Sequence, residues 1–135
     1  MERQVRVLIA DDRPATRRGL RALLALLSQV KITGEAADGA ECVDLVAEHR
    51  PDVVLMDMQM PVMDGVEATR RIREQWPEVR VIALTMYTKY RAQALAAGAD
   101  AFLLKDGRPD VLLGAILGQV QGPSGQSAAP WQLTS

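Results

Sequence analysis

Residues 53–65 read VVLMDMQMPVMDG and are the most informative segment of the chain for its fold. The apolar residues Val53 to Met56 run directly into Asp57. A short, unbroken apolar run is typical of a strand that is covered on both faces, as in the parallel sheet of an α/β protein. Asp57 would then lie at the carboxyl end of a strand, which is where open α/β sheets bind their ligands.

Other apolar runs extend this pattern along the chain. Three of them span Val5 to Ala10, Val79 to Leu84 and Ala101 to Leu104. A weaker run, Val30 to Ala37, is interrupted by polar residues and predicts a strand at the edge of the sheet.

Helical patterns lie between the strands. The first has a leucine stripe at the spacing of one helix face and begins near Pro14, which suits a first turn. The stripe consists of Leu20, Leu23, Leu24 and Leu27. A second amphipathic pattern consists of Val66, Thr69, Ile72 and Trp76. A short helix is expected over Arg91 to Ala97, and the last helix from Pro109 to about Val120.

Two helices start with the same capping chemistry. Asp38 and Asp64 each precede a helical pattern and are followed three residues later by a glutamate, Glu41 or Glu67. This spacing predicts a capping box at both helix starts. Five strands that alternate with five helices predict an α/β fold with a parallel sheet and helices on both faces.

Bulk properties indicate one soluble domain. The 135 residues fit a single compact unit, and a net charge of −1 gives no general attraction to nucleic acid or membranes. The single cysteine, Cys42, excludes an intramolecular disulfide and is expected to fill the core. We find neither a signal peptide nor a membrane-spanning run, and we expect a cytoplasmic protein.

Polar residues stand at four predicted strand ends. They are Asp11, Asp12, Asp57, Thr85 and Lys105. Alone, each has an ordinary explanation as a helix cap, a turn residue or a surface lysine. Together they place acids, a hydroxyl and an ammonium at one edge of the sheet, which is a set suited to Mg²⁺ and to phosphoryl transfer.

Four segments of the chain resemble a known family. The segments VLIADD, VVLMDMQMPVMDGVEA, VIALT and AGADAFLLKD are similar to the receiver domains of bacterial two-component response regulators, of the NarL/LuxR type. The resemblance covers nearly the whole folded part. It implies a flavodoxin-like, doubly wound sheet of order 2-1-3-4-5, with residues 1–121 as the receiver domain. Residues 122–135, rich in Gly, Pro, Ser and Ala, are expected to form a flexible tail or linker.

The resemblance also implies a phosphoacceptor site. Asp57 would accept a phosphoryl group from a sensor histidine kinase. The metal Mg²⁺ would be held by Asp12, Asp57 and the backbone carbonyl of Gln59, and Asp11 would act mostly through a bound water.

Three more residues follow from the same resemblance. Thr85 would hydrogen-bond the phosphoryl oxygens, Lys105 would pair with the phosphate, and Phe102 would occupy the aromatic switch position. The implied function is a switch that changes its interaction surface on phosphorylation.

Other functions remain open. A phosphatase or phosphotransferase with an external substrate would need an acid two residues after the nucleophile, where Gln59 stands, so we expect no enzyme beyond self-assisted phosphorylation and dephosphorylation. A third reading is a pseudo-receiver that acts only as an interaction module.

NarL/LuxR-type regulators usually continue into a DNA-binding output domain that is absent here, so nucleic-acid binding is not expected within the chain. The alternative is a single-domain receiver that acts through protein–protein contacts.

Three departures from the family pattern stand near the site. Only 20 positions separate Thr85 from Lys105, so the loop or helix between them should be short. Met86 follows Thr85 and would narrow access to Asp57. Arg13 follows the acidic pair and would weaken the repulsion among the carboxylates.

The last helix has two apolar rows, Leu112-Ile116-Val120 and Leu113-Leu117. Gly114 and Gly118, four residues apart, would let a second backbone approach. One interpretation places both rows in the core, and the other predicts a homodimer through this helix, which the leucine-rich first helix would join.

Overall fold

Five parallel strands form one sheet in the order β2-β1-β3-β4-β5, which confirms the predicted fold and the edge position of β2. The computed structural model describes residues 3–118. The strands are β1 Val5–Ala10, β2 Val30–Ala36, β3 Val53–Met56, β4 Arg80–Thr85 and β5 Ala101–Leu104. The helices are α1 Pro14–Leu24, α2 Gly39–His49, α3 Gly65–Gln75, α4 Arg91–Ala96 and α5 Pro109–Leu117, with a 3₁₀ turn η1 at Thr88–Tyr90.

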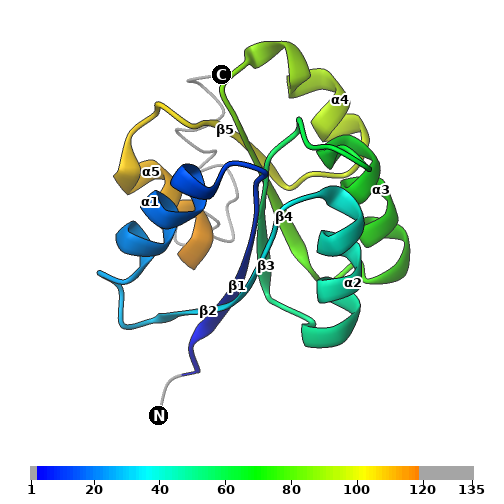
Figure 1. Cartoon of the computed structure of the whole chain (residues 1–135). Coiled ribbons are helices and arrows are strands. Elements are labelled where there is room, and N and C mark those ends of the chain that lie inside the picture. The colour runs from blue at the N-terminus through cyan, green and yellow to red at the C-terminus, as the bar shows by residue number, and fades with distance from the viewer. Residues whose placement is uncertain (1–2, 119–135) are drawn as a thin grey trace.

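The helices cover the sheet on both faces, with α1 and α5 on one side and α2, α3 and α4 on the other (Figure 1). Each face has its own apolar core. Alternate residues of β3 supply the two cores: Val54 and Met56 pack toward α2 and α3, whereas Val53 and Leu55 pack toward α1 and α5. All four β3 residues are buried, as expected for a central parallel strand.

Helix starts follow the sequence prediction only in part. The carboxylates of Asp38 and Asp64 accept hydrogen bonds from the backbone N–H groups of Glu41 and Glu67, so both are N-caps. The side chain of Glu41 accepts from the backbone N–H of Ala37, one residue before the expected partner. The side chain of Glu67 pairs with arginines of its own helix, so the second capping box is not closed.

Helix α5 is shorter than predicted. It ends at Leu117, and Gly118 adopts a left-handed conformation with φ of 73°. Gly118 is therefore a helix terminator and not an interior glycine, which corrects the paired-glycine interpretation. Val120 lies outside the described residues, as does the expected tail at 122–135.

Two further expectations concern core residues. Cys42 is fully buried in the core under α2, as predicted. Leu27 packs on the α1 side of the sheet but lies beyond the end of α1 at Leu24, because the helix stops before the last member of the stripe. Among residues 3–118, no helix is long and apolar enough to cross a bilayer.

Candidate functional site

Three carboxylates meet at the carboxyl ends of β1 and β3. The backbone N–H of Asp57 donates to the carbonyl of Ala10 at 2.9 Å, which places Asp57 beside the end of β1. Carboxylate oxygens of Asp11, Asp12 and Asp57 all lie within 4.8 Å of one another. The convergence predicted from the strand ends is therefore present, because β1 and β3 are neighbours in the sheet.

Lys105 reaches this cluster from the end of β5. Its Nζ lies 2.6 Å from Oδ2 of Asp11 and 3.5 Å from Oδ2 of Asp57. Its backbone N–H donates to the carbonyl of Thr85 at 2.8 Å, which fixes the start of the lysine side chain over the end of β4. The ammonium thus pairs first with Asp11, a contact that the sequence did not predict.

The electrostatics of Asp57 are unusual for a carboxylate. Burial raises the pKa of Asp57 above its ordinary value, the charge of Lys105 opposes that rise, and the charge of Asp11 adds to it. The backbone N–H of Gln59 donates to Oδ1 of Asp57 at 3.4 Å and also favours the charged form. A group that is 7% exposed and held next to two other acids therefore gains from any added cation.

The donor set fits a hard divalent cation. Carboxylate oxygens from Asp11, Asp12 and Asp57 lie close enough to share one ion, and Mg²⁺ prefers oxygen ligands and retains waters. Asp12 is exposed, which leaves solvent access for those waters. The Lys105 ammonium already supplies one positive charge to Asp11 and Asp57. A bound metal ion would add further positive charge to the same carboxylates.

A crevice of about 600 Å³ opens above these residues. Thr85 lines it and is buried, with its hydroxyl accepting from the backbone N–H of Tyr87 at 3.4 Å. Gln59 and Met86 also line it, and Met86 is 46% exposed. That Met86 narrows access to Asp57 stays a prediction. Tyr87 and Tyr90 line the crevice as well, and the strand-end argument did not identify them.

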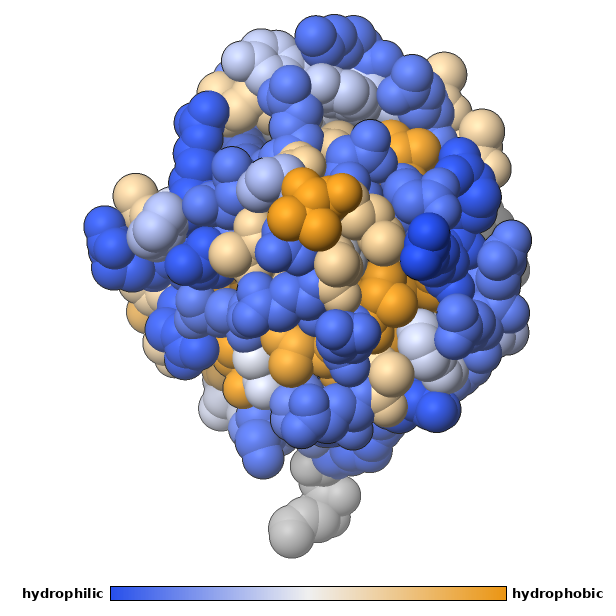
Figure 2. All heavy atoms as spheres, turned by 45° about the vertical axis from the view of Figure 1, so that its right-hand side comes forward, coloured by the Kyte–Doolittle hydropathy of each residue, from blue (hydrophilic) through white to orange (hydrophobic). Residues whose placement is uncertain are grey.

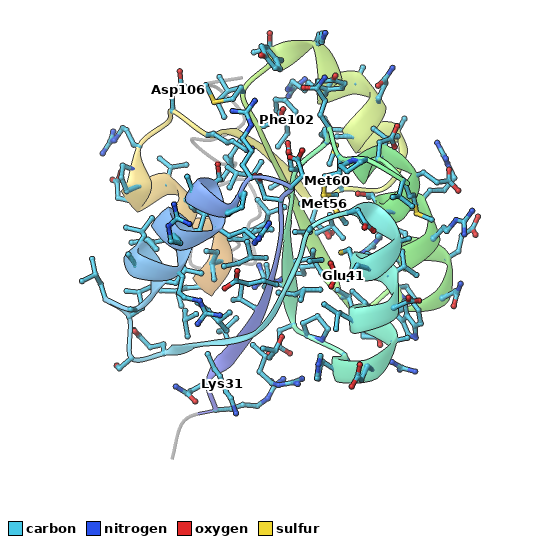
Figure 3. All side chains as sticks on the ribbon, viewed as in Figure 1. Lys31, Glu41, Met56, Met60, Phe102 and Asp106 are labelled. Atoms are coloured by element: carbon cyan, nitrogen blue, oxygen red, sulfur yellow. The ribbon has the colours of Figure 1, made fainter. Side chains whose placement is uncertain are left out.

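Phe102 is not among the residues that line this crevice. It is labelled at the upper end of the sheet in Figure 3, near Met60, and is only 2% exposed. The aromatic ring is thus already packed into the core, so no further burial is needed for it to occupy an inward position.

Two features beside Asp57 were not anticipated. A Cβ on Gly65 would collide with the backbone carbonyl of Asp57, so only glycine allows α3 to start this close to Asp57. Val62, in the loop between them, has φ of 71° and is 83% exposed, which is a strained conformation for a β-branched residue. The Asp-Gly pair at the helix start was the available signal for the first.

The departures from the family pattern have separate outcomes. Helix α4 has six residues, so the short connection between Thr85 and Lys105 is taken up by a short helix after η1. Arg13 is exposed and forms no ion pair with the three acids within residues 3–118, so the expected neutralisation comes from Lys105 instead.

Comparison with known proteins agrees with this geometry. The family model of the response regulator receiver domain matches residues 7–117. The chain is 40% identical over 111 residues to the uncharacterized transcriptional regulatory protein YhcZ of Bacillus subtilis, covering 81% of this chain and 52% of that protein. It is 37% identical over 121 residues to the probable transcriptional regulatory protein NarL of Mycobacterium tuberculosis, covering 88% of this chain and 56% of that protein.

Solved structures give the same result. The signal receiver domain of the putative response regulator NarL from Mycobacterium tuberculosis superposes with a TM-score of 0.83 at 36% identity, covering 90% of this chain and 99% of that chain. A LuxR-family two-component response regulator from Aurantimonas sp. gives 0.82 at 30% identity, covering 98% and 99%. The chain spans about half the length of the curated relatives it matches. This protein belongs to the response regulator receiver domain family, with relatives among the NarL/LuxR-type transcriptional regulators.

Proposed function

We propose that this domain is a phosphorylation-controlled switch in which Asp57 accepts a phosphoryl group from a sensor histidine kinase. The observation that supports this most directly is the buried carboxylate of Asp57, which lies among Asp11, Asp12 and Lys105 at the floor of an open crevice. The output would be regulation of transcription through a domain outside this chain. No nucleic-acid contact is proposed for the chain itself.

The chemistry assigns a role to each residue. A carboxylate oxygen of Asp57 attacks the phosphorus of a phosphohistidine, the P–N bond breaks, and the electron pair remains on the imidazole nitrogen. Lys105, 3.5 Å from Asp57, moves its charge toward the transferred oxygens, and the Thr85 hydroxyl donates to one of them. Gln59 is an amide and cannot serve as the general acid that a phosphatase with an external substrate would need at this position, so no external turnover substrate is proposed.

Mg²⁺ is proposed to be held by Asp12, Asp57 and the backbone carbonyl of Gln59, with Asp11 holding a water. When bound, the ion supplies positive charge to the carboxylates and to the transferred group. Asp11 is already engaged by Lys105 at 2.6 Å, which supports the ranking of Asp12 above Asp11 as a direct ligand.

Mass measurement tests the phosphoacceptor. Incubation with acetyl phosphate and Mg²⁺ should add one phosphoryl group to the wild type and none to Asp57→Asn. The matched control, Asp106→Asn, changes an exposed aspartate just beyond Lys105 and should be modified normally. Modification of Asp57→Asn at the wild-type rate would eliminate the assignment.

Metal titration tests the ligand ranking. Asp12→Ala should weaken Mg²⁺ binding more than Asp11→Ala does, and equal losses in the two variants would contradict the assignment.

Phe102 and Thr85 are proposed to relay the phosphorylated state to the surface. A cytoplasmic location is proposed because a sensor kinase donates its phosphoryl group there.

The homodimer through α5 remains a proposal. Its surviving support is Gly114, where an added Cβ would meet no atom within 4 Å. Leu113 and Leu117 are partly buried against the core, which favours the alternative interpretation of both rows as core. Sedimentation of Leu117→Arg with and without beryllofluoride would distinguish the two, because a wild type that stays monomeric in both states has no such dimer. A single-domain receiver that acts by protein contacts alone is the alternative function.

A further inference from the structure

A second cavity shares Lys105 with the crevice above Asp57. It has a volume of about 530 Å³ and lies between α1, α5 and the ends of β4 and β5. Its apolar wall includes Leu84, Leu103 and Leu112, which are only 4%, 6% and 7% exposed. The cavity therefore extends down to core residues and is not a shallow surface depression.

A glycine in helix α1 keeps this space open, although glycine destabilises a helix interior. Gly19 lines the cavity from the middle of α1, and a Cβ added there would meet no atom within 4 Å. A glycine inside a helix costs about 1 kcal/mol relative to alanine, so a larger residue would both stabilise α1 and fill the cavity. Apolar cavities of roughly 300–1,000 Å³ are the usual size of small-molecule sites.

The charge at the mouth of the cavity is positive. Arg13 and Arg108 line it together with Lys105. Lys105 is committed to Asp11, and Arg108 pairs with Asp110 at 2.6 Å. Within residues 3–118, the guanidinium of Arg13 has neither a hydrogen-bond partner nor an ion-pair partner, so it is the cation that remains available to a ligand.

We infer that this cavity binds a small amphipathic carboxylate, with its apolar body between α1 and α5 and its anionic group on Arg13. Charge complementarity selects this occupant: the wall is apolar, the rim is basic, and an Arg fork matches a carboxylate. The face of the molecule that Figure 2 shows, which brings forward the side of α2, α3 and α4, is mostly hydrophilic with scattered apolar side chains.

A ligand bound in this cavity would also affect the site around Asp57, an inference that rests on the proposed function. Arg13, Met86 and Lys105 line both the cavity and the crevice above Asp57. A ligand that draws Arg13 toward the cavity removes a positive charge from the rim of the crevice. The ligand would therefore act as an effector of phosphorylation.

Calorimetric titration with decanoate, below its micelle concentration, tests the site in the unphosphorylated domain. The wild type should bind one decanoate, and Gly19→Leu should bind at least about tenfold more weakly because its side chain fills the cavity. The matched control is Gly114→Leu, since Gly114 is also a helical glycine with open space at its Cβ but does not line the cavity. This control should bind as the wild type does.

Charge is tested with a second pair of measurements. Arg13→Gln should lose about fivefold in decanoate affinity, consistent with one partly exposed charge-assisted contact, and should bind decanol as the wild type does. Asp57→Asn should retain decanoate binding while losing phosphorylation, so failure of this site is distinguishable from failure of the proposed function.

Three results would overturn the inference. They are absence of saturable decanoate binding by the wild type, equal binding by a folded Gly19→Leu, and equal affinity for decanol and decanoate. Sedimentation of the same variants provides the competing outcome: a wild-type dimer that Gly19→Leu converts to monomer, without decanoate binding, would show that a second copy covers the cavity.

Discussion

Removing the charge of Asp57 should stabilise the domain when metal is absent. Asp57 is 7% exposed and shares its site with two other carboxylates, all within 4.8 Å. Replacement by asparagine keeps the size and the polarity of the side chain but removes the charge. We therefore expect Asp57→Asn to unfold at higher temperature than the wild type in EDTA at pH 7.

The magnitude follows from the distances. At an effective dielectric constant of about 20, two unit charges 4.8 Å apart repel by about 3.5 kcal/mol. The attraction of Lys105 at 3.5 Å is about 4.7 kcal/mol on the same scale, which offsets more than one of the two repulsions but not both. Because Asp12 is exposed and screened, we expect a net gain of about 1–2 kcal/mol, or about 3–8 °C in Tm.

The pH dependence has a defined sign. Burial raises the pKa of Asp57 in the folded protein, so the folded state keeps its proton at pH values where the unfolded chain has lost it. Stability of the wild type should rise as pH falls through that raised pKa toward the ordinary carboxyl value of about 4. The advantage of Asp57→Asn should shrink over the same window.

Added Mg²⁺ should reverse the order of stability. An ion at 100 times its Kd stabilises the folded wild type by about 2.7 kcal/mol, and Asp57→Asn should gain much less. Thermal and urea unfolding in EDTA and in Mg²⁺ measure both effects, with Asp106→Asn as the exposed control, expected within about 0.5 kcal/mol of wild type. An Asp57→Asn variant that is less stable than wild type in EDTA would show that the charge of Asp57 does not destabilise the metal-free fold.

Three other changes test separate contacts. In urea unfolding at pH 7, Lys105→Met should destabilise the domain by about 3 kcal/mol, because it leaves the buried carboxylate of Asp11 without its cation. Adding Asp11→Asn to this variant should restore much of the lost stability. Arg80→Met should lower the free energy of unfolding by about 2 kcal/mol and speed amide exchange in α5. The reason is that the Arg80 guanidinium donates to two carbonyls near the end of that helix, at 2.9 and 2.6 Å. Unchanged exchange would show that this contact does not hold the helix end. Val62→Gly should stabilise by about 1 kcal/mol in thermal unfolding by relieving a left-handed β-branched residue, and a loss of stability would mean that this conformation is not strained.

Most of the site was predictable because it depends on strand ends. A buried strand is visible in sequence as a short apolar run, and the helical crossovers of βαβ units make consecutive strands parallel. Their carboxyl ends then fall on one edge of the sheet. Asp11, Asp57, Thr85 and Lys105 follow from this rule. Asp57, Thr85 and Lys105 line one crevice, and Asp11 pairs with Lys105 beside it.

The partners of the charged groups were not predictable. Lys105 lies nearer to Asp11 than to Asp57, and Arg13 forms no ion pair with the acids within residues 3–118, because side-chain pairing depends on how β5 and α1 sit over the sheet. The end of α5 is similar: Arg80, at the start of β4, donates to carbonyls of a helix that is distant in sequence. No local pattern encodes such a contact.

The class of fold and the chemistry of the carboxyl edge could be predicted from the amino-acid sequence, since periodicity and strand-end residues are local properties of the chain. Which charges pair and where empty space remains depend on the packing of remote elements. The cavity beside Gly19 illustrates the difference, because it exists between helices α1 and α5 that are far apart in the chain. Its shape is set by how closely those helices pack on one face of the sheet, and packing distances between remote elements are not written in the periodicity of either one.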